Sequence, residues 1–96
     1  MSTNTGHKFI RHDNNTGTYV VQIFGMNLDI TCESLGEALQ VRLDCLLNGL
    51  SESAQELIRC CQEGNDKGAL VHGNDVTLYT QWLYTIQQES RGVKEV

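Results

Sequence analysis

The sequence predicts an α+β fold in which a three-stranded antiparallel meander packs against a helical hairpin and a C-terminal helix. Three observations support this prediction. Residues 8–31 alternate β-branched or aromatic runs with turn residues, residues 34–63 repeat apolar residues at helical spacing, and the chain contains no proline. With 96 residues, the chain has the length of a single domain with one modest hydrophobic core.

The meander is expected to begin with a strand at residues 9–12. Residues 13–17 follow as a turn, because Asp, Asn and Gly residues tolerate left-handed backbone angles. Residues 18–24 form the strongest strand candidate, since β-branched and aromatic residues dominate it, and a third strand is expected over residues 26–31 after a break at the glycine. Residues 1–7 are small and polar, so we expect a mobile arm there.

Two helices are predicted next, over residues 34–63. Ser34 and Glu37 match a reciprocal N-terminal cap, in which the serine oxygen accepts one amide hydrogen bond and the glutamate reaches back to another. The Asn48-Gly49 pair suits a helix C-terminus, and the serines after it suit a second N-cap. A helical hairpin is therefore expected, with the apolar face of its first helix toward the sheet.

The second helix of this hairpin is expected to bury one apolar stripe, formed by Ala54, Leu57, Ile58 and Cys61. Residues 67–73 are consistent either with a short fourth strand or with an extended connection. A C-terminal helix is predicted over residues 74–90, because its apolar spacing and length outweigh the strand preference of its threonines. Its buried residues are expected to be Val76, Tyr79, Trp82, Leu83 and Ile86. Residues 91–96 are expected to form a tail.

The composition points away from several classes of partner. Twelve acidic and seven basic residues give a formal net charge of -5, which would repel the phosphate backbone of a nucleic acid. No segment has the apolar length of a membrane span or a signal peptide, so we expect a cytoplasmic protein without a direct nucleic-acid or membrane partner. The four cysteines include an adjacent pair and fall mostly on predicted helices, which favours reduced thiols over a disulfide framework.

Metal, cofactor and catalytic motifs are not expected. The sequence has no C-x-x-C or H-x-x-x-H spacing, so neither a metal nor another cofactor is predicted. Cys61 is expected at the centre of a buried stripe. Cys32 precedes a helix N-terminus, which favours a thiolate, so a thiol-dependent enzyme or redox sensor that uses Cys32 or Cys60 remains an alternative. The carboxylate pairs lie on polar helix faces, which favours a non-enzymatic protein.

The candidate partner-binding residues are mainly acidic. Arg42 falls in the middle of the apolar face of the first helix, where it either packs at the edge of the core or contacts a partner. Tyr84 lies opposite the apolar stripe of the C-terminal helix and is a candidate exposed aromatic. The acidic candidates, which lie on the polar faces of the hairpin helices, are Glu37, Asp44, Glu52, Glu56 and Glu63.

The predicted order of three strands and a helix, with residues 31–39 at the junction, is loosely similar to HicB-type antitoxins over about a third of the chain. The DNA-binding segment that such antitoxins append is not found in these residues. We expect a small acidic, non-enzymatic protein that binds a basic protein, such as one that handles nucleic acid, as an inhibitor or adaptor, as phage or mobile-element proteins do. The alternative from another class is a homo-oligomer, such as a homodimer, that pairs through an edge strand or the Arg42 face.

Overall fold

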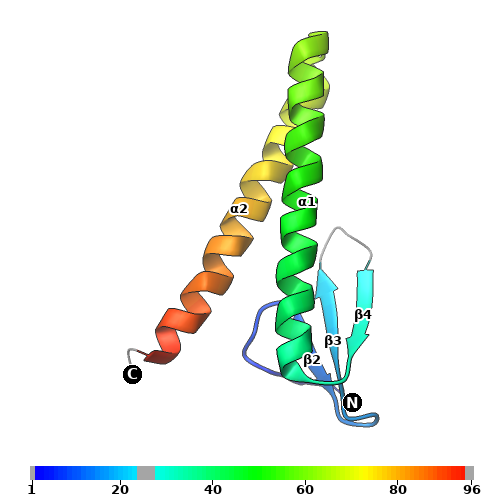
Figure 1. Cartoon of the computed structure of the whole chain (residues 1–96), viewed down its shortest axis with the longest axis vertical. Helices are drawn as coiled ribbons and strands as arrows, with labels where there is room; N and C mark the ends of the chain where they lie inside the picture. The colour runs from blue at the N-terminus through cyan, green and yellow to red at the C-terminus, as the bar shows by residue number, and fades with distance from the viewer. Residues whose placement is uncertain (1, 24–27, 95–96) are drawn as a thin grey trace. The chain divides into compact units, whose positions relative to one another are not determined.

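The computed structural model describes residues 2–23 and 28–94 and confirms the α+β fold class. An antiparallel sheet comes first and two long helices follow (Figure 1). The contacts within the chain define two compact units, which divide inside the first helix after Asp44. The elements are β1 (Ser2–Asn4), β2 (Ile10–Asp13), β3 (Thr18–Ile23), β4 (Leu28–Cys32), α1 (Leu35–Glu63) and α2 (Asp66–Lys94).

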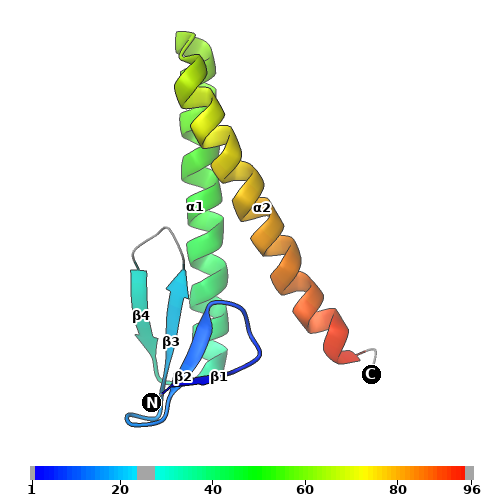
Figure 2. The same ribbon diagram turned by 180° about the vertical axis from the view of Figure 1, so that it is seen from behind.

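The sheet has the spatial order β1-β2-β3-β4, and all neighbouring strands run antiparallel (Figure 2). Strands β2, β3 and β4 form the predicted meander, with Ile10 opposite Val21. The predicted turn between β2 and β3 is confirmed, because the Gly17 amide donates to the Asp13 carbonyl at 2.8 Å. Gly17 has a φ of 73°, an angle that only glycine adopts without strain from a Cβ atom. The expected break at residue 25 lies outside the described residues.

Strand β1 adds a fourth strand where the sequence predicts a mobile arm over residues 1–7. Ser2 is paired with Asp13, and Asn4 is paired with Arg11. The polar sequence of this segment has no alternation of apolar residues that would predict a strand. Backbone hydrogen bonds to β2 hold it instead, and pairing of this kind depends little on side-chain type.

Most of the core of the first unit lies on one face of the sheet. Alternating positions on β2, β3 and β4 place Ile10, Val21, Ile23 and Cys32 on this face, and all four are buried. The first turn of α1 contributes Ala38, which is fully buried. The opposite face carries the exposed polar residues Gln22, Asp29 and Thr31, together with Val20, which is buried.

Helix α1 begins as the sequence predicts and then continues through the predicted break. The Ser34 hydroxyl accepts the amide hydrogen of Glu37 at 3.1 Å, which is the expected N-cap bond. The helix does not end at Asn48-Gly49 but at Glu63, so one helix of 29 residues replaces the predicted hairpin over residues 34–63. Asn and Gly each cost a helix interior only about 1 kcal/mol or less, and packing around Gly49 outweighs that cost.

Helix α2 begins at Asp66, ahead of the predicted start at residue 74. Residues 69–71, for which the sequence left a strand or an extended connection open, are helical, and residues 91–94 of the predicted tail belong to the same helix. Two glycines, Gly68 and Gly73, make this segment a poor helix by propensity, because each costs about 1 kcal/mol relative to alanine. An N-cap at Asn65 and close packing against α1 offset this cost.

In the second unit, α1 and α2 approach each other at glycine positions. A Cβ atom added to Gly49 would lie 2.5 Å from Cζ of Tyr79, so only glycine leaves room for the tyrosine ring. Tyr79 packs edge-on against Trp82, with the ring centroids 5.6 Å apart. A Cβ atom on Gly73 would make an ordinary contact of 3.9 Å with Cδ1 of Leu57. Gly49 therefore serves helix packing and not helix termination.

Candidate functional site

The five acidic residues predicted to meet a partner all lie on α1. Glu37 and Asp44 belong to the first unit, and Glu52, Glu56 and Glu63 belong to the second. Four of the five are exposed, and Glu56 is half-exposed. Spacings of four and seven residues place the last three on one side of the helix. We call the group formed by Glu52, Glu56 and Glu63 the acidic flank.

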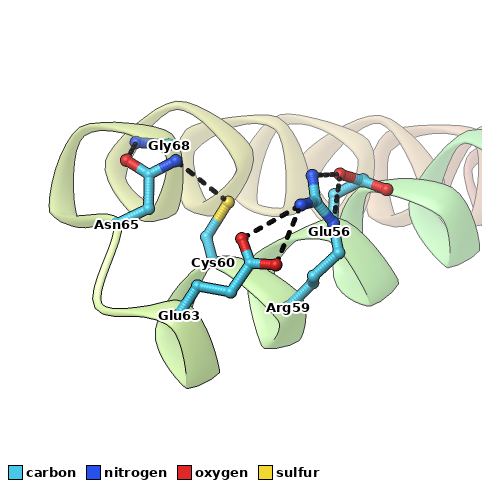
Figure 3. Close-up of polar contacts among 6 residues, drawn as sticks. All are labelled: Glu56, Arg59, Cys60, Glu63, Asn65 and Gly68. Carbon is cyan, nitrogen blue, oxygen red and sulfur yellow. Dashed lines mark hydrogen bonds and ion pairs between the residues drawn. The ribbon is translucent and has the colours of Figure 1, made fainter.

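Arg59 lies between two carboxylates of the acidic flank and pairs with both (Figure 3). Its Nε donates to Oε2 of Glu56 at 3.2 Å, and its Nη1 donates to Oε1 of Glu63 at 3.1 Å. The hydrogen bond from Arg59, followed by the charge of the guanidinium, lowers the pKa of Glu56, and nearby His72 lowers it further. One cation thus holds two carboxylates in place, and three carboxylates against one guanidinium leave an excess of negative charge.

Helix α2 brings a further carboxylate to this region. Burial of the phenol raises the pKa of Tyr79, and the negative charges of Asp75 and Glu52 raise it further. Asp75 precedes Tyr79 by four residues on α2, and Glu52 follows Gly49, which the tyrosine ring covers, by three residues on α1, so each lies one helical turn from this contact. One acidic residue of each helix is therefore placed within a turn of the contact between Tyr79 and Gly49.

The turn between α1 and α2 provides hydrogen-bond partners for both helix ends within two residues, Gly64 and Asn65. Gly64 has a φ of 72° and donates its amide hydrogen to the carbonyl of Cys61 at 3.3 Å, while Asn65 donates to the carbonyl of Cys60 at 2.8 Å. These two bonds form a Schellman motif. The Asn65 Oδ1 then accepts the amide hydrogen of Gly68 at 3.0 Å and caps α2. The turn is thereby fixed by backbone geometry and one amide side chain.

The structure reverses the prediction for the two adjacent cysteines. Cys61, which was expected in a buried stripe, is exposed, and Cys60 is buried against the turn with its Sγ 3.9 Å from Nδ2 of Asn65. Cys60 is buried because α1 is one continuous helix. Gly49 and Cys60 are eleven residues apart, which is about three helical turns, so both lie on the face of α1 that packs against α2. Cys32, the other residue considered for thiol chemistry, is buried as well. Reactive cysteines are typically in part exposed, so the two candidate thiols lie in poor positions for such chemistry.

Arg42 lies inside the first unit and not on its surface. The residue is 5% exposed, and its Nη1 donates to the carbonyl oxygen of Lys8 at 2.9 Å. The next residue, Phe9, has a φ of 70°, which is rare and strained for a bulky side chain. The guanidinium therefore binds the backbone next to a strained residue, which favours the core-edge alternative for Arg42, and a contact of Arg42 with a partner stays an untested prediction.

Tyr84 is 62% exposed on α2, which confirms the exposure predicted from its position opposite the apolar stripe. It is one of several large apolar residues that the second unit leaves in solvent. Ile58, which the sequence placed in a buried stripe, is among them. The others are Leu47, Leu70, Val71 and Leu78.

Histidine, cysteine and carboxylate side chains do not assemble into a metal centre in residues 2–23 and 28–94, where no three of them gather closely enough to hold an ion. His12 instead belongs to the β2–β3 hairpin, because its Nδ1 lies 2.8 Å from Oδ1 of Asn14 and its ring lies 4.7 Å from that of Tyr19. Over the same described ranges, neither long helix carries an apolar stretch sufficient to cross a bilayer.

Comparisons with known proteins find no relative. No protein-family model, no curated protein and no solved structure matches the chain at a significant level. The loose similarity to HicB-type antitoxins thus gains no support from these comparisons. Any functional proposal for this chain has to be argued from its own residues.

Proposed function

We propose that this chain is a non-enzymatic binding protein whose acidic flank docks on a basic surface of another protein, as an inhibitor or adaptor does. The observation that supports the proposal is the accessible group of carboxylates at Glu52, Glu56 and Glu63, of which Glu56 and Glu63 are paired with Arg59. The chain as a whole carries a formal charge of -5, so its long-range field adds to that of the flank. Such a field attracts basic proteins and repels nucleic acid.

The pairing with Arg59 supports binding in a specific way. Immobilising a long side chain at an interface costs about 0.5–1.5 kcal/mol, and the two bonds to Arg59 already restrict Glu56 and Glu63 before a partner arrives. Binding a partner therefore costs less side-chain conformational entropy at Glu56 and Glu63 than it would at unpaired glutamates. A partner surface that offers arginine or lysine at matching spacing gains charge-assisted hydrogen bonds.

The test is affinity capture from the native host with two charge-reversed variants. The flank variant carries Glu52→Lys and Glu63→Lys, and the control carries Asp29→Lys and Glu33→Lys, which change the net charge equally at exposed positions of the first unit. We expect a basic protein to be retained by the wild type and the control, lost from the flank variant, and released as salt approaches about 1 M, where charges are screened within about 3 Å. A captured protein that the flank variant still retains, or that withstands such salt, contradicts the proposal.

A further inference from the structure

A second surface of the molecule repeats apolar residues every seven positions along α2. Leu70, Val71, Leu78 and Tyr84 are between 41% and 68% exposed. Leu70 and Tyr84 are two heptads apart with Thr77 midway, and Val71 and Leu78 are one heptad apart with Thr85 next in the series. We call these residues the outer stripe; they are Leu70, Val71, Thr77, Leu78, Tyr84 and Thr85.

The threonines of the outer stripe are less polar than their sequence suggests. The Thr77 hydroxyl donates to the carbonyl of Gly73 at 3.1 Å, and the Thr85 hydroxyl donates to the carbonyl of Gln81 at 2.9 Å. Both residues are exposed, and both hydroxyls are engaged with the helix backbone. The methyl groups are therefore the main feature that these threonines offer to a neighbour.

The outer stripe lies away from the face that α2 uses within its own unit. Tyr79 contacts α1 over Gly49, and Gly68 approaches Cys60, so the inner face contains positions 68 and 79. At 100° per residue, Thr77 and Tyr84 lie roughly opposite that face. Heptad spacing of exposed apolar residues is typical of a seam between two helices, and monomeric proteins rarely expose such contiguous stripes.

The stripe is complementary to itself in an antiparallel arrangement. With a two-fold axis between positions 77 and 78, Thr77 is level with Leu78 of a second copy, Leu70 is level with Thr85 of the second copy, and Val71 is level with Tyr84 of the second copy. Apolar groups thus meet apolar groups at every level of the stripe. An unrelated helix has no reason to reproduce this match.

The polar residues along the same line match in the same register. Asn74 is level with Gln81 of the second copy, which pairs one amide with another, and Lys67 is level with Gln88 of the second copy, which pairs a cation with an amide that can accept its hydrogen bond. A parallel arrangement would instead set each residue against itself, including Lys67 against Lys67. The antiparallel arrangement also aligns the two helix dipoles favourably.

We propose that two copies of this chain associate through their outer stripes, with α2 packed antiparallel against α2 of the second copy. The outer stripe shares no residue with the acidic flank. The inference therefore goes beyond the proposed function, and its test does not depend on whether the acidic flank binds a partner. About ten positions on each copy take part, fewer than the 20–30 residues of a standard interface. The expected dissociation constant is therefore weak, on the order of micromolar.

Sedimentation equilibrium of the full chain from about 1 μM to about 1 mM tests the proposal. The mass is expected to rise from 10.7 kDa toward twice that value with concentration. Leu78→Glu and Tyr84→Glu are expected to weaken association by about tenfold or more, whereas Ile58→Glu, at a residue 57% exposed on α1, leaves it unchanged. Circular dichroism establishes that each variant is folded, and since all three residues are exposed, each tolerates a polar side chain.

Cross-linking tests the register. Two single variants, Asn74→Cys and Gln81→Cys, are mixed in a Cys61→Ser background that removes the exposed native thiol. Antiparallel packing predicts a disulfide between the two different variants, and a disulfide of each variant with itself overturns that register. A wild type that stays monomeric at all concentrations, or an Ile58→Glu variant that dissociates as readily as Leu78→Glu, overturns the proposal itself.

Discussion

Replacing Gly49 with alanine is expected to destabilise the protein, although the substitution improves the helix propensity of α1. Gly49 lies in the interior of a 29-residue helix, where alanine is normally favoured by about 1 kcal/mol. The added Cβ atom would lie 2.5 Å from Cζ and 2.8 Å from the hydroxyl oxygen of Tyr79, well inside van der Waals contact. The sign of the effect therefore depends on whether the tyrosine ring can move.

The packing around Tyr79 makes that movement costly. The ring lies edge-on against Trp82 at 5.6 Å between centroids, so a shift away from α1 disturbs a second aromatic residue. Overpacking of this kind costs about 1–3 kcal/mol, which exceeds or cancels the gain in propensity. We expect Gly49→Ala to lower the free energy of unfolding by up to about 2 kcal/mol.

Gly73→Ala is the matched control, because a Cβ atom there meets only Leu57 at an ordinary 3.9 Å. This variant is expected to raise the free energy of unfolding by up to about 1 kcal/mol, or the melting temperature by about 4–8 °C. Urea unfolding followed by circular dichroism measures both variants, and the Tyr79→Ala background supplies the decisive comparison. With the ring removed, Gly49→Ala should become stabilising; if it already stabilises the protein that retains Tyr79, the steric argument fails.

Three further predictions concern single side chains. Arg42→Ala is expected to lower the free energy of unfolding by about 2–3 kcal/mol, because a buried charged hydrogen bond to the backbone is lost; chemical denaturation measures this, and a loss below about 0.5 kcal/mol contradicts the structural role. Asn65→Ala is expected to cost about 1 kcal/mol through loss of the α2 cap, whereas Asn65→Ser retains most of the stability. The hydrogen bond from Arg59 lowers the pKa of Glu56 in the folded protein below its ordinary value of 4.5. The pair therefore stabilises the fold at pH values above 4.5, and this stabilisation is lost as the pH falls through the lowered pKa of the folded state. Carboxyl NMR titration should show this pKa return toward 4.5 in Arg59→Gln.

The class of the fold follows from local sequence signals that tertiary contacts do not alter. The turn residues around Gly17 and the serine cap at Ser34 each act within a few residues, and both occur as predicted. Gly49 is different, because its structural role depends on packing against the ring of Tyr79, which is thirty residues away in sequence. From its sequence neighbours alone, the Asn48-Gly49 pair predicts the end of a helix. The sequence therefore predicts two helices where the structure has one.

The candidate site shows the same division. The exposure of the acids on α1 follows from their helical spacing, and the Glu56, Arg59 and Glu63 spacings of three and four residues are a local signal that predicts the observed ion pairs. The exchange of roles between Cys60 and Cys61 does not follow locally, because it depends on the phase of a helix whose continuity is set by packing. Strand β1 likewise depends on backbone pairing with β2, and the polar side chains of β1 do not predict this pairing.

Salt separates the two proposed contacts, because its effect on them has opposite sign. Each copy carries a formal charge of -5, so two copies repel each other, and screening that repulsion strengthens association through an apolar stripe. The attraction between an acidic flank and a basic protein weakens under the same screening. Raising salt from about 0.05 M to about 1 M should therefore increase the dimer fraction in sedimentation while it releases the captured partner. Self-association that weakens with salt would instead point to pairing through oppositely charged groups, and would count against the outer stripe as the main source of affinity.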